Sequence, residues 1–169
     1  MKLIKVHYLD ASALVKLLVK ESGSESLTQY MRNEALSSFL TTSLCFAEAL
    51  GVLKVKHRRR EIDQEQYLAA IDELRAYISG KNLQLVDVSI SDDSIFNEVE
   101  ALIRRHNNSI DVSDALQLVA LKKDFFARFP ETKPILITAD CLLAIAARRE
   151  DLRVWDCLRE QPPVEEAHA

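Results

Sequence analysis

Three aspartates lie where the chain could do chemistry. Asp10 and Asp140 each come directly after a short apolar run, and Asp114 lies in the first turn of a helical pattern. If these carboxylates converge they repel one another, because two unit charges about 4 Å apart cost roughly 4 kcal/mol at an effective dielectric constant of about 20. A hard divalent cation, which prefers oxygen ligands, offsets that repulsion. No His or Cys has ligand spacing to the acids, so Mg²⁺ or Mn²⁺ is expected rather than zinc.

Glu48 is a fourth acid of interest. Its helical pattern predicts that it shares a face with a set of apolar or small residues, namely Leu44, Gly51, Val52 and Val55. A carboxylate buried on such a face is costly unless it is paired or bound to a cation. No helix cap explains this position, so Glu48 is predicted to be functional.

Helix capping is the competing explanation for the aspartates. Aspartate is a favoured N-cap residue, and an acid in the first helical turn complements the helix dipole. Each of Asp10, Asp111 and Asp140 precedes a helical pattern, and Asp114 lies within a first turn. Taken singly, each aspartate is explained by capping at least as well as by catalysis. Asp111 stays open between a further metal ligand and a cap.

The elements that position these acids follow from an alternation of apolar runs and helical patterns. Five runs of β-forming residues predict strands at about residues 3–9, 38–42, 83–88, 134–138 and 152–156. Helical patterns between them predict an α/β fold with a central, mostly parallel sheet of about five strands and helices on both faces. Ligands in such folds bind outside the carboxyl ends of the strands, where Asp10 and Asp140 are expected.

Length and composition indicate one globular domain. The chain has 169 residues, of which 48% are hydrophobic, and it lacks the uncharged apolar stretch of about 18 residues that a membrane span needs. We predict a domain over residues 1–158 and a disordered acidic tail over residues 159–169. Without signal-peptide features, and with three cysteines that lack metal spacing, the protein is expected in the cytoplasm. The net charge of −4 excludes a nucleic-acid footprint spread over the whole surface.

Five segments of the sequence resemble those of PIN-domain nucleases. They are YLDASALVKLL, AEAL, DVSDALQLVAL, ITADCLLAIAA and RVWDC, and they run from about residue 3 to about residue 157. The resemblance is greatest to the VapC-type toxins of type II toxin–antitoxin systems. The acidic positions of the family match Asp10, Glu48, Asp114 and Asp140. The resemblance implies that these four residues are catalytic and bind the metal. Ser12 and Thr138 match supporting hydroxyl positions, although local turn hydrogen bonds are an alternative role for both.

The resemblance also implies an activity and partners. It implies a PIN-like three-layer α/β/α sandwich and a Mg²⁺- or Mn²⁺-dependent endoribonuclease, which hydrolyses RNA phosphodiester bonds by metal-activated water. It further implies the toxin of a toxin–antitoxin pair, with a cognate antitoxin protein as partner, and a homodimer. No membrane association is expected, because the sequence lacks an apolar stretch long enough to span a membrane. The alternative is a noncatalytic RNA- or protein-binding module on the same fold, against which the complete set of acids argues.

A basic stretch ends the predicted helix that carries Glu48. It holds five cations in residues 54–60, namely Lys54, Lys56, Arg58, Arg59 and Arg60. Two interpretations carry equal weight. The cations contact RNA phosphates, or they stabilise the C-terminal end of the helix through its dipole and keep the surface soluble.

Three other classes of protein fit the sequence less well. An aspartyl phosphatase would carry a second Asp where this chain has Ser12. A nucleotide-binding fold needs a glycine-rich turn after a strand, and the chain has only three scattered glycines. A phosphoacceptor signalling domain would use Asp87, near the end of the third predicted strand, but would leave Glu48 without a role.

Overall fold

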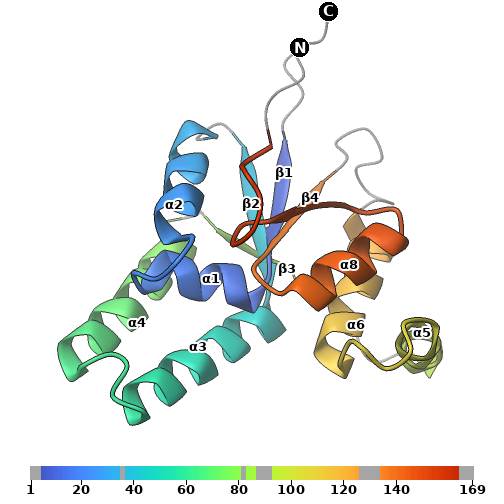
Figure 1. Cartoon of the computed structure of the whole chain (residues 1–169), viewed down its shortest axis with the longest axis horizontal. Coiled ribbons are helices and arrows are strands. Elements are labelled where there is room, and N and C mark those ends of the chain that lie inside the picture. The colour runs from blue at the N-terminus through green and yellow to red at the C-terminus, as the bar shows by residue number, and fades with distance from the viewer. Residues whose placement is uncertain (1–4, 35–36, 81–82, 87–92, 126–133, 164–169) are drawn as a thin grey trace, which may run out of the picture.

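A computed structural model describes residues 5–34, 37–80, 83–86, 93–125 and 134–163 (Figure 1). Within these ranges the chain forms a five-stranded sheet in the order β3-β2-β1-β4-β5, and all neighbouring strands are parallel. The strands are β1 Val6–Leu9, β2 Ser38–Thr42, β3 Gln84–Val86, β4 Ile135–Thr138 and β5 Arg153–Asp156. The predicted α/β class is therefore confirmed, and each strand falls within its predicted range.

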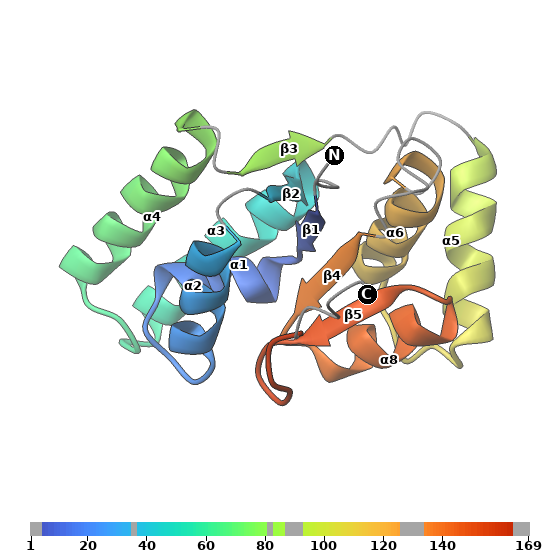
Figure 2. The same ribbon diagram turned by 90° about the horizontal axis from the view of Figure 1, so that it is seen from above.

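Helices cover both faces of the sheet (Figure 2). On one side lie α1 Ala11–Leu18, α2 Ser24–Asn33, α3 Ser43–Arg58 and α4 Gln64–Ser79. On the other side lie α5 Asp93–Arg105, α6 Val112–Ala120 and α8 Cys141–Arg149. A π-helical turn, η1 Leu121–Phe125, continues α6. The result is the three-layer α/β/α arrangement that was expected.

The order in which the chain builds the sheet singles out the ends of β1 and β4. After β1 the chain adds β2 and β3 on one side, and it then returns to add β4 and β5 on the other. The strand order thus reverses between β1 and β4, and ligands of open parallel sheets bind outside the carboxyl ends at such a reversal. In Figure 1 the strands run downward, so their carboxyl ends lie at the bottom of the sheet. The first residues of α1, α3, α6 and α8 lie near these strand ends.

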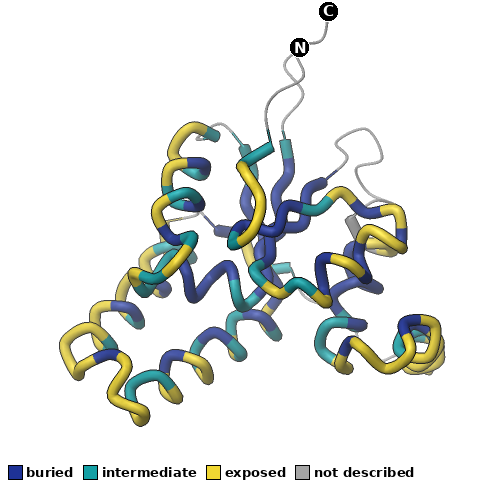
Figure 3. Tube along the Cα trace, in the orientation of Figure 1, coloured by how far each residue is buried: buried dark blue, intermediate teal, exposed yellow. Residues whose placement is uncertain are grey.

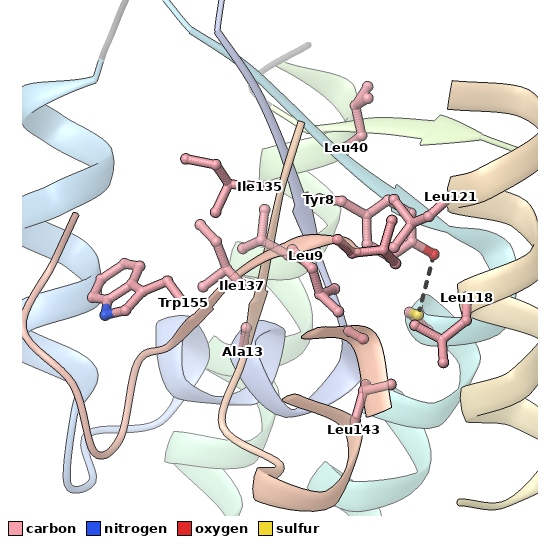
Figure 4. Close-up of a cluster of buried hydrophobic side chains, with 14 of the residues drawn as sticks. Tyr8, Leu9, Ala13, Leu40, Leu118, Leu121, Ile135, Ile137, Leu143 and Trp155 are labelled. Atoms are coloured by element: carbon pink, nitrogen blue, oxygen red, sulfur yellow. Dashed lines mark hydrogen bonds between the residues drawn. The ribbon is translucent and has the colours of Figure 1, made fainter. Parts of the chain in front are cut away.

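The central strands are buried because helices cover both of their faces and other strands pair with both of their edges. All four residues of β1 and all four of β4 are buried, as is typical of the continuous apolar runs of central parallel strands. Tyr8 and Leu9 of β1 and Ile137 of β4 belong to one hydrophobic core with Leu118 and Trp155 (Figure 4). The exposed residues lie mostly on the outer sides of the helices (Figure 3). Each fully buried Leu or Ile contributes about 1.5–3 kcal/mol, so the core holds the strand ends firmly.

The segment after β5 packs against the rest of the domain. Gly23, at the start of α2, has a φ of 87°, and a Cβ there would lie 2.9 Å from the carbonyl oxygen of Cys157. The indole N–H of Trp155 donates to the carbonyl oxygen of Glu160 at 3.2 Å. Glu160 was predicted to lie in a disordered tail, but these contacts hold it on the domain. Residues 164–169 of that tail lie outside the described residues.

Three smaller expectations concern the membrane, the cysteines and an alternative site. None of the described helices combines the length and the apolar character needed to cross a membrane. Cys45, Cys141 and Cys157 are free thiols, and two of them are buried. Asp87, on which the phosphoacceptor alternative depended, lies outside the described residues.

Candidate functional site

Asp10 is a deeply buried acid at the carboxyl end of β1. It caps α1, and only 3% of its surface is exposed. Burial raises the pKa of its carboxyl group from 3.8 to about 6, and the charge of Asp140 raises it further. Hydrogen bonds from Thr138, Ala13 and Ser12 oppose this increase. A buried carboxyl group with a perturbed pKa at the end of a central strand is a candidate for function in addition to its role as a cap.

Two hydroxyl groups link Asp10 to the end of β4. Thr138 donates to Asp10 Oδ2 at 2.6 Å, and the Ser12 hydroxyl lies 2.8 Å from both carboxylate oxygens. Each hydroxyl oxygen also accepts a backbone N–H, Ser12 from Ala139 at 2.8 Å and Thr138 from Asp140 at 2.9 Å. Both hydroxyls therefore support Asp10. Each makes one contact within its own turn and one contact that joins the end of β1 to the end of β4.

Asp111 and Asp114 form a capping box at the start of α6. Asp111 Oδ1 accepts the N–H of Asp114 at 2.9 Å, and Asp114 Oδ2 accepts the N–H of Asp111 at 3.4 Å. Asp111 is exposed and has the contacts of a cap. Asp114 differs, because burial raises its pKa from 3.8 to about 7. The charges of Asp111, Asp140 and Asp10 add to that increase.

Asp10, Asp114 and Asp140 therefore share one electrostatic environment, although they come from three separate segments. We refer to these three residues as the aspartate cluster. The partial positive charge of helix N-termini offsets some of their repulsion, since Asp10 caps α1 and Asp114 lies in the first turn of α6. Asp140 caps α8, where its Oδ1 accepts the N–H groups of Leu142 at 2.7 Å and Leu143 at 3.2 Å.

The aspartate cluster supplies the oxygen donors that Mg²⁺ and Mn²⁺ prefer. Within the described ranges, no group of three or more His, Cys, Asp and Glu side chains has the spacing to hold a metal ion by itself. Mg²⁺ is commonly held by one or two carboxylates and keeps several water ligands, so a partial protein shell still suits it. The raised pKa of Asp114 fits as well, because a neighbouring cation would favour its charged form. Asp10, with Asp114 or Asp140, would hold such an ion.

The predicted environment of Glu48 is wrong. Its side chain is half-buried, and Gly51, Val52 and Val55 on the predicted apolar face are exposed. The face of α3 that packs on the core is instead formed by residues at positions i, i+4 and i+8, namely Cys45, Ala49 and Leu53. Apolar residues occur on more than one face of this helix, so the pattern did not identify the buried one. Glu48 lies about 7.5 Å along the axis from the first residue of α3, which begins at the carboxyl end of β2.

The basic stretch lies at the far end of α3. Arg59 is about 16 Å along the helix axis from Glu48, and α3 points away from α6 and α8 (Figure 1). Lys56 pairs with Glu21 at 3.0 Å and with Glu61 at 3.2 Å, so its charge is largely neutralised. The other four cations, Lys54, Arg58, Arg59 and Arg60, are exposed. Any contact of the stretch with RNA is therefore remote from the aspartate cluster.

A surface cavity of about 400 Å³ lies elsewhere on the molecule. Its lining comes from the end of α1, from α2 and α4, and from the start of β2 and β3, and it includes Arg32, Phe39, Glu73 and Tyr77. This is the amino end of the sheet, opposite to the aspartate cluster, and none of the predicted site residues lines it. The cavity is therefore not the candidate site.

Sequence reasoning missed one side chain beside the aspartate cluster. Arg159 was assigned to the tail, yet its Nη1 donates to the carbonyl oxygen of Ala139 at 3.0 Å and to Asp156 Oδ2 at 2.9 Å. Ala139 lies between Thr138 and Asp140, so the guanidinium is at the rim of the site. The available signal for a fixed turn was the spacing of Asp156, which ends a predicted strand, and Arg159 three residues later.

Comparisons with known proteins bear on the fold alone. No family model matches the sequence, and no curated protein matches it. Among solved structures, the chain is similar to the crystal structure of PAE2754 from Pyrobaculum aerophilum, with a TM-score of 0.56 and 17% sequence identity. The match covers 85% of this chain and 79% of that chain. At this identity the likeness supports the three-layer fold and carries no activity across.

Proposed function

We propose that this protein is a Mg²⁺- or Mn²⁺-dependent endoribonuclease of the PIN-domain type. The observation that carries the proposal is the buried Asp10 at the reversal of strand order, tied to β4 by Ser12 and Thr138 and close enough to Asp114 and Asp140 to share their charge. The sequence resemblance to PIN-domain nucleases adds support, since it picks out the same residues. Residues this far apart in the chain rarely gather their carboxylates without a ligand to compensate the repulsion.

Each residue of the cluster has a part in the proposed reaction. A bound divalent cation would supply a water of lowered pKa and would offset negative charge on the phosphate. Asp10 holds its position because three donors, the hydroxyls of Ser12 and Thr138 and the N–H of Ala13, fix both carboxylate oxygens. Asp114, with a pKa of about 7, holds or releases a proton at its carboxylate near neutral pH. Asp140 adds negative charge at the rim, where its Oδ1 is fixed by the α8 N-terminus.

A toxin role follows from the same resemblance. The cognate antitoxin would place a cationic side chain against the aspartate cluster, where charge-assisted hydrogen bonds to carboxylates are strong. A homodimer and a cytoplasmic location belong to this proposal. Expression of the chain alone should slow growth, and co-expression of the antitoxin should restore it. Normal growth with abundant active protein would remove the toxin role but not the nuclease activity.

The nuclease activity has a direct test. Purified protein is incubated with structured and unstructured RNAs in Mg²⁺, in Mn²⁺ and in excess EDTA, and the fragments are resolved by length. Internal cleavage in either metal and none in EDTA is the expected result. Cleavage that persists in EDTA would contradict the metal-dependent mechanism. A lack of cleavage in all conditions would contradict the proposal that the protein is a ribonuclease.

A second candidate function is a noncatalytic RNA- or protein-binding module. It is favoured by the lack, in the described part of the chain, of a complete metal-ligand group, and by the half-exposed position of Glu48. A metal titration followed by calorimetry separates the two, because only the enzyme requires saturable binding of Mg²⁺ or Mn²⁺ at the aspartate cluster.

A further inference from the structure

The turn after β5 fixes a cation beside the aspartate cluster. Asp156, the last residue of β5, is paired in register with Thr138, and its side chain is only 5% exposed. Its Oδ1 accepts the backbone N–H groups of Leu158 at 3.1 Å and Arg159 at 3.2 Å. Its Oδ2 accepts a hydrogen bond from Arg159 Nη1 at 2.9 Å. A buried carboxylate therefore sets both the turn and the direction of the arginine.

The guanidinium of Arg159 reaches the rim of the site. Nη1 also donates to the carbonyl oxygen of Ala139 at 3.0 Å, the residue before Asp140. The pKa of Arg159 is raised chiefly by its hydrogen bond to Asp156, and the charges of Cys141 and Asp140 contribute as well. The cation thus lies within the electrostatic range of Asp140 but is hydrogen-bonded to a carboxylate outside the cluster.

Most of the hydrogen-bonding capacity of Arg159 is uncommitted. A guanidinium has five N–H donors in a planar fork, and the bonds to Ala139 and Asp156 both come from Nη1. Among the described residues, none accepts a hydrogen bond from Nε or Nη2, and 49% of the side chain is exposed. Such a fork matches the geometry of two phosphate oxygens. Because the turn already restrains the side chain, binding a phosphate would cost it little further conformational entropy.

Among the described residues, Arg159 is a cation that hydrogen bonds hold beside the aspartate cluster. Burial is the main cause of the raised pKa values of Asp10 and Asp114, and the charges of the neighbouring aspartates add to it. When they are ionised, the clustered carboxylates repel the phosphodiester of an RNA chain. We propose that Arg159 binds a phosphate group of the substrate beside the aspartate cluster, an inference that rests on the proposed ribonuclease function. It would hold a nonbridging pair of oxygens at the rim, next to Asp140. The basic stretch at the far end of α3 is too remote to serve there.

Binding of a short, fluorescent single-stranded RNA in EDTA tests this role without cleavage. The proteins are the wild type, Arg159→Gln, Arg159→Lys and the matched control Arg148→Gln. Arg148 is 42% exposed and is paired with Glu160 in the same C-terminal region, but it lies on α8. Affinity is measured over a range of salt concentrations, and unfolding curves establish that each variant is folded.

The expected results separate charge from structure. Arg159→Gln should weaken binding several-fold and flatten the slope of log K against log salt by about 0.7, the value for one phosphate contact on a single strand. Arg159→Lys keeps the charge and its pairing with Asp156, so the salt slope should not change. It should bind RNA more weakly than the wild type, because lysine lacks the planar fork of the guanidinium. Arg148→Gln should match the wild type. If Arg159→Gln leaves the slope unchanged, or changes it no more than Arg148→Gln does, Arg159 only fixes the turn and the inference is wrong.

Failure of this inference and failure of the nuclease proposal give different results. If the wild type binds RNA with the expected Arg159 dependence but never cleaves in Mg²⁺ or Mn²⁺, the phosphate contact is supported and the nuclease proposal is wrong. If the wild type cleaves but Arg159→Gln binds RNA as the control does, the nuclease proposal is supported and the phosphate contact is wrong. A wild type that fails to bind RNA at all overturns the contact.

Discussion

Replacing Asp114 by Asn removes one charge from the aspartate cluster while keeping the capping box. The Asn Oδ1 still accepts the N–H of Asp111. The pKa of Asp114 is raised from 3.8 to about 7, a difference worth about 4 kcal/mol at about 1.4 kcal/mol per pKa unit. Asp114 is only partly buried, so solvent screening reduces this figure, and we expect about 2 kcal/mol.

The sign of the effect depends on pH. Because the folded state holds the Asp114 proton more tightly than the unfolded state, the wild type loses stability as pH rises from about 4 to about 7 and loses no more above that. Asp114→Asn does not titrate. Its free energy of unfolding should therefore equal that of the wild type near pH 4 and exceed it by about 2 kcal/mol near pH 8.

Urea unfolding in EDTA at several pH values measures this difference. The control is Asp63→Asn, which removes a charge from another capping box, at the exposed start of α4. Asp63→Asn should slightly destabilise the protein, because its charge complements the helix dipole. If the advantage of Asp114→Asn does not grow with pH, burial and the neighbouring aspartates do not raise the pKa of Asp114, and the electrostatic description of the aspartate cluster is wrong.

Three further predictions use the same contacts. Mg²⁺ or Mn²⁺ at about a hundred times its dissociation constant should add about 2.7 kcal/mol to the unfolding free energy, and Asp10→Asn and Asp140→Asn should abolish the resulting increase in melting temperature. With the pKa of Asp10 at about 6 and that of Asp114 at about 7, calorimetry in different buffers should detect protons released on metal binding near pH 6, and few near pH 8. Thr138→Val removes a hydrogen bond to Asp10, so the pKa of Asp10 should rise, as read by NMR titration, and stability should fall by about 1–3 kcal/mol.

The sheet was predictable because its strands are short apolar runs that end at recognisable residues. Asp10 after β1 and Asp140 after β4 both followed from this pattern, and parallel strands bring such ends to one edge of the sheet. The family resemblance gave Ser12 and Thr138 as supporting positions, but their hydrogen bonds to Asp10 were seen only in the structure. No spacing in the sequence relates Asp10 to Thr138, which is 128 positions away.

The sequence was less informative about burial and about tertiary contacts. The α3 helix has apolar residues on more than one face, so periodicity alone selected the wrong neighbours for Glu48. Arg159 is 20 residues from Ala139, and its hydrogen bond depends on how β5 pairs with β4. Polar residues after the last strand are typical of a frayed tail, and only the register of the two strands shows that this arginine returns to the site.

Asp10→Asn tests most directly whether Asp10 belongs to a metal-dependent nuclease centre. Asn preserves the shape of the side chain and caps a helix about as well as Asp. Single-turnover cleavage of RNA in Mn²⁺ is compared for the two proteins after unfolding curves establish that both are folded. We expect the wild type to cleave and Asp10→Asn to be at least about a hundredfold slower, because it loses a charge that a catalytic cation needs. Equal rates in the two folded proteins would show that Asp10 is not part of a metal-dependent nuclease centre.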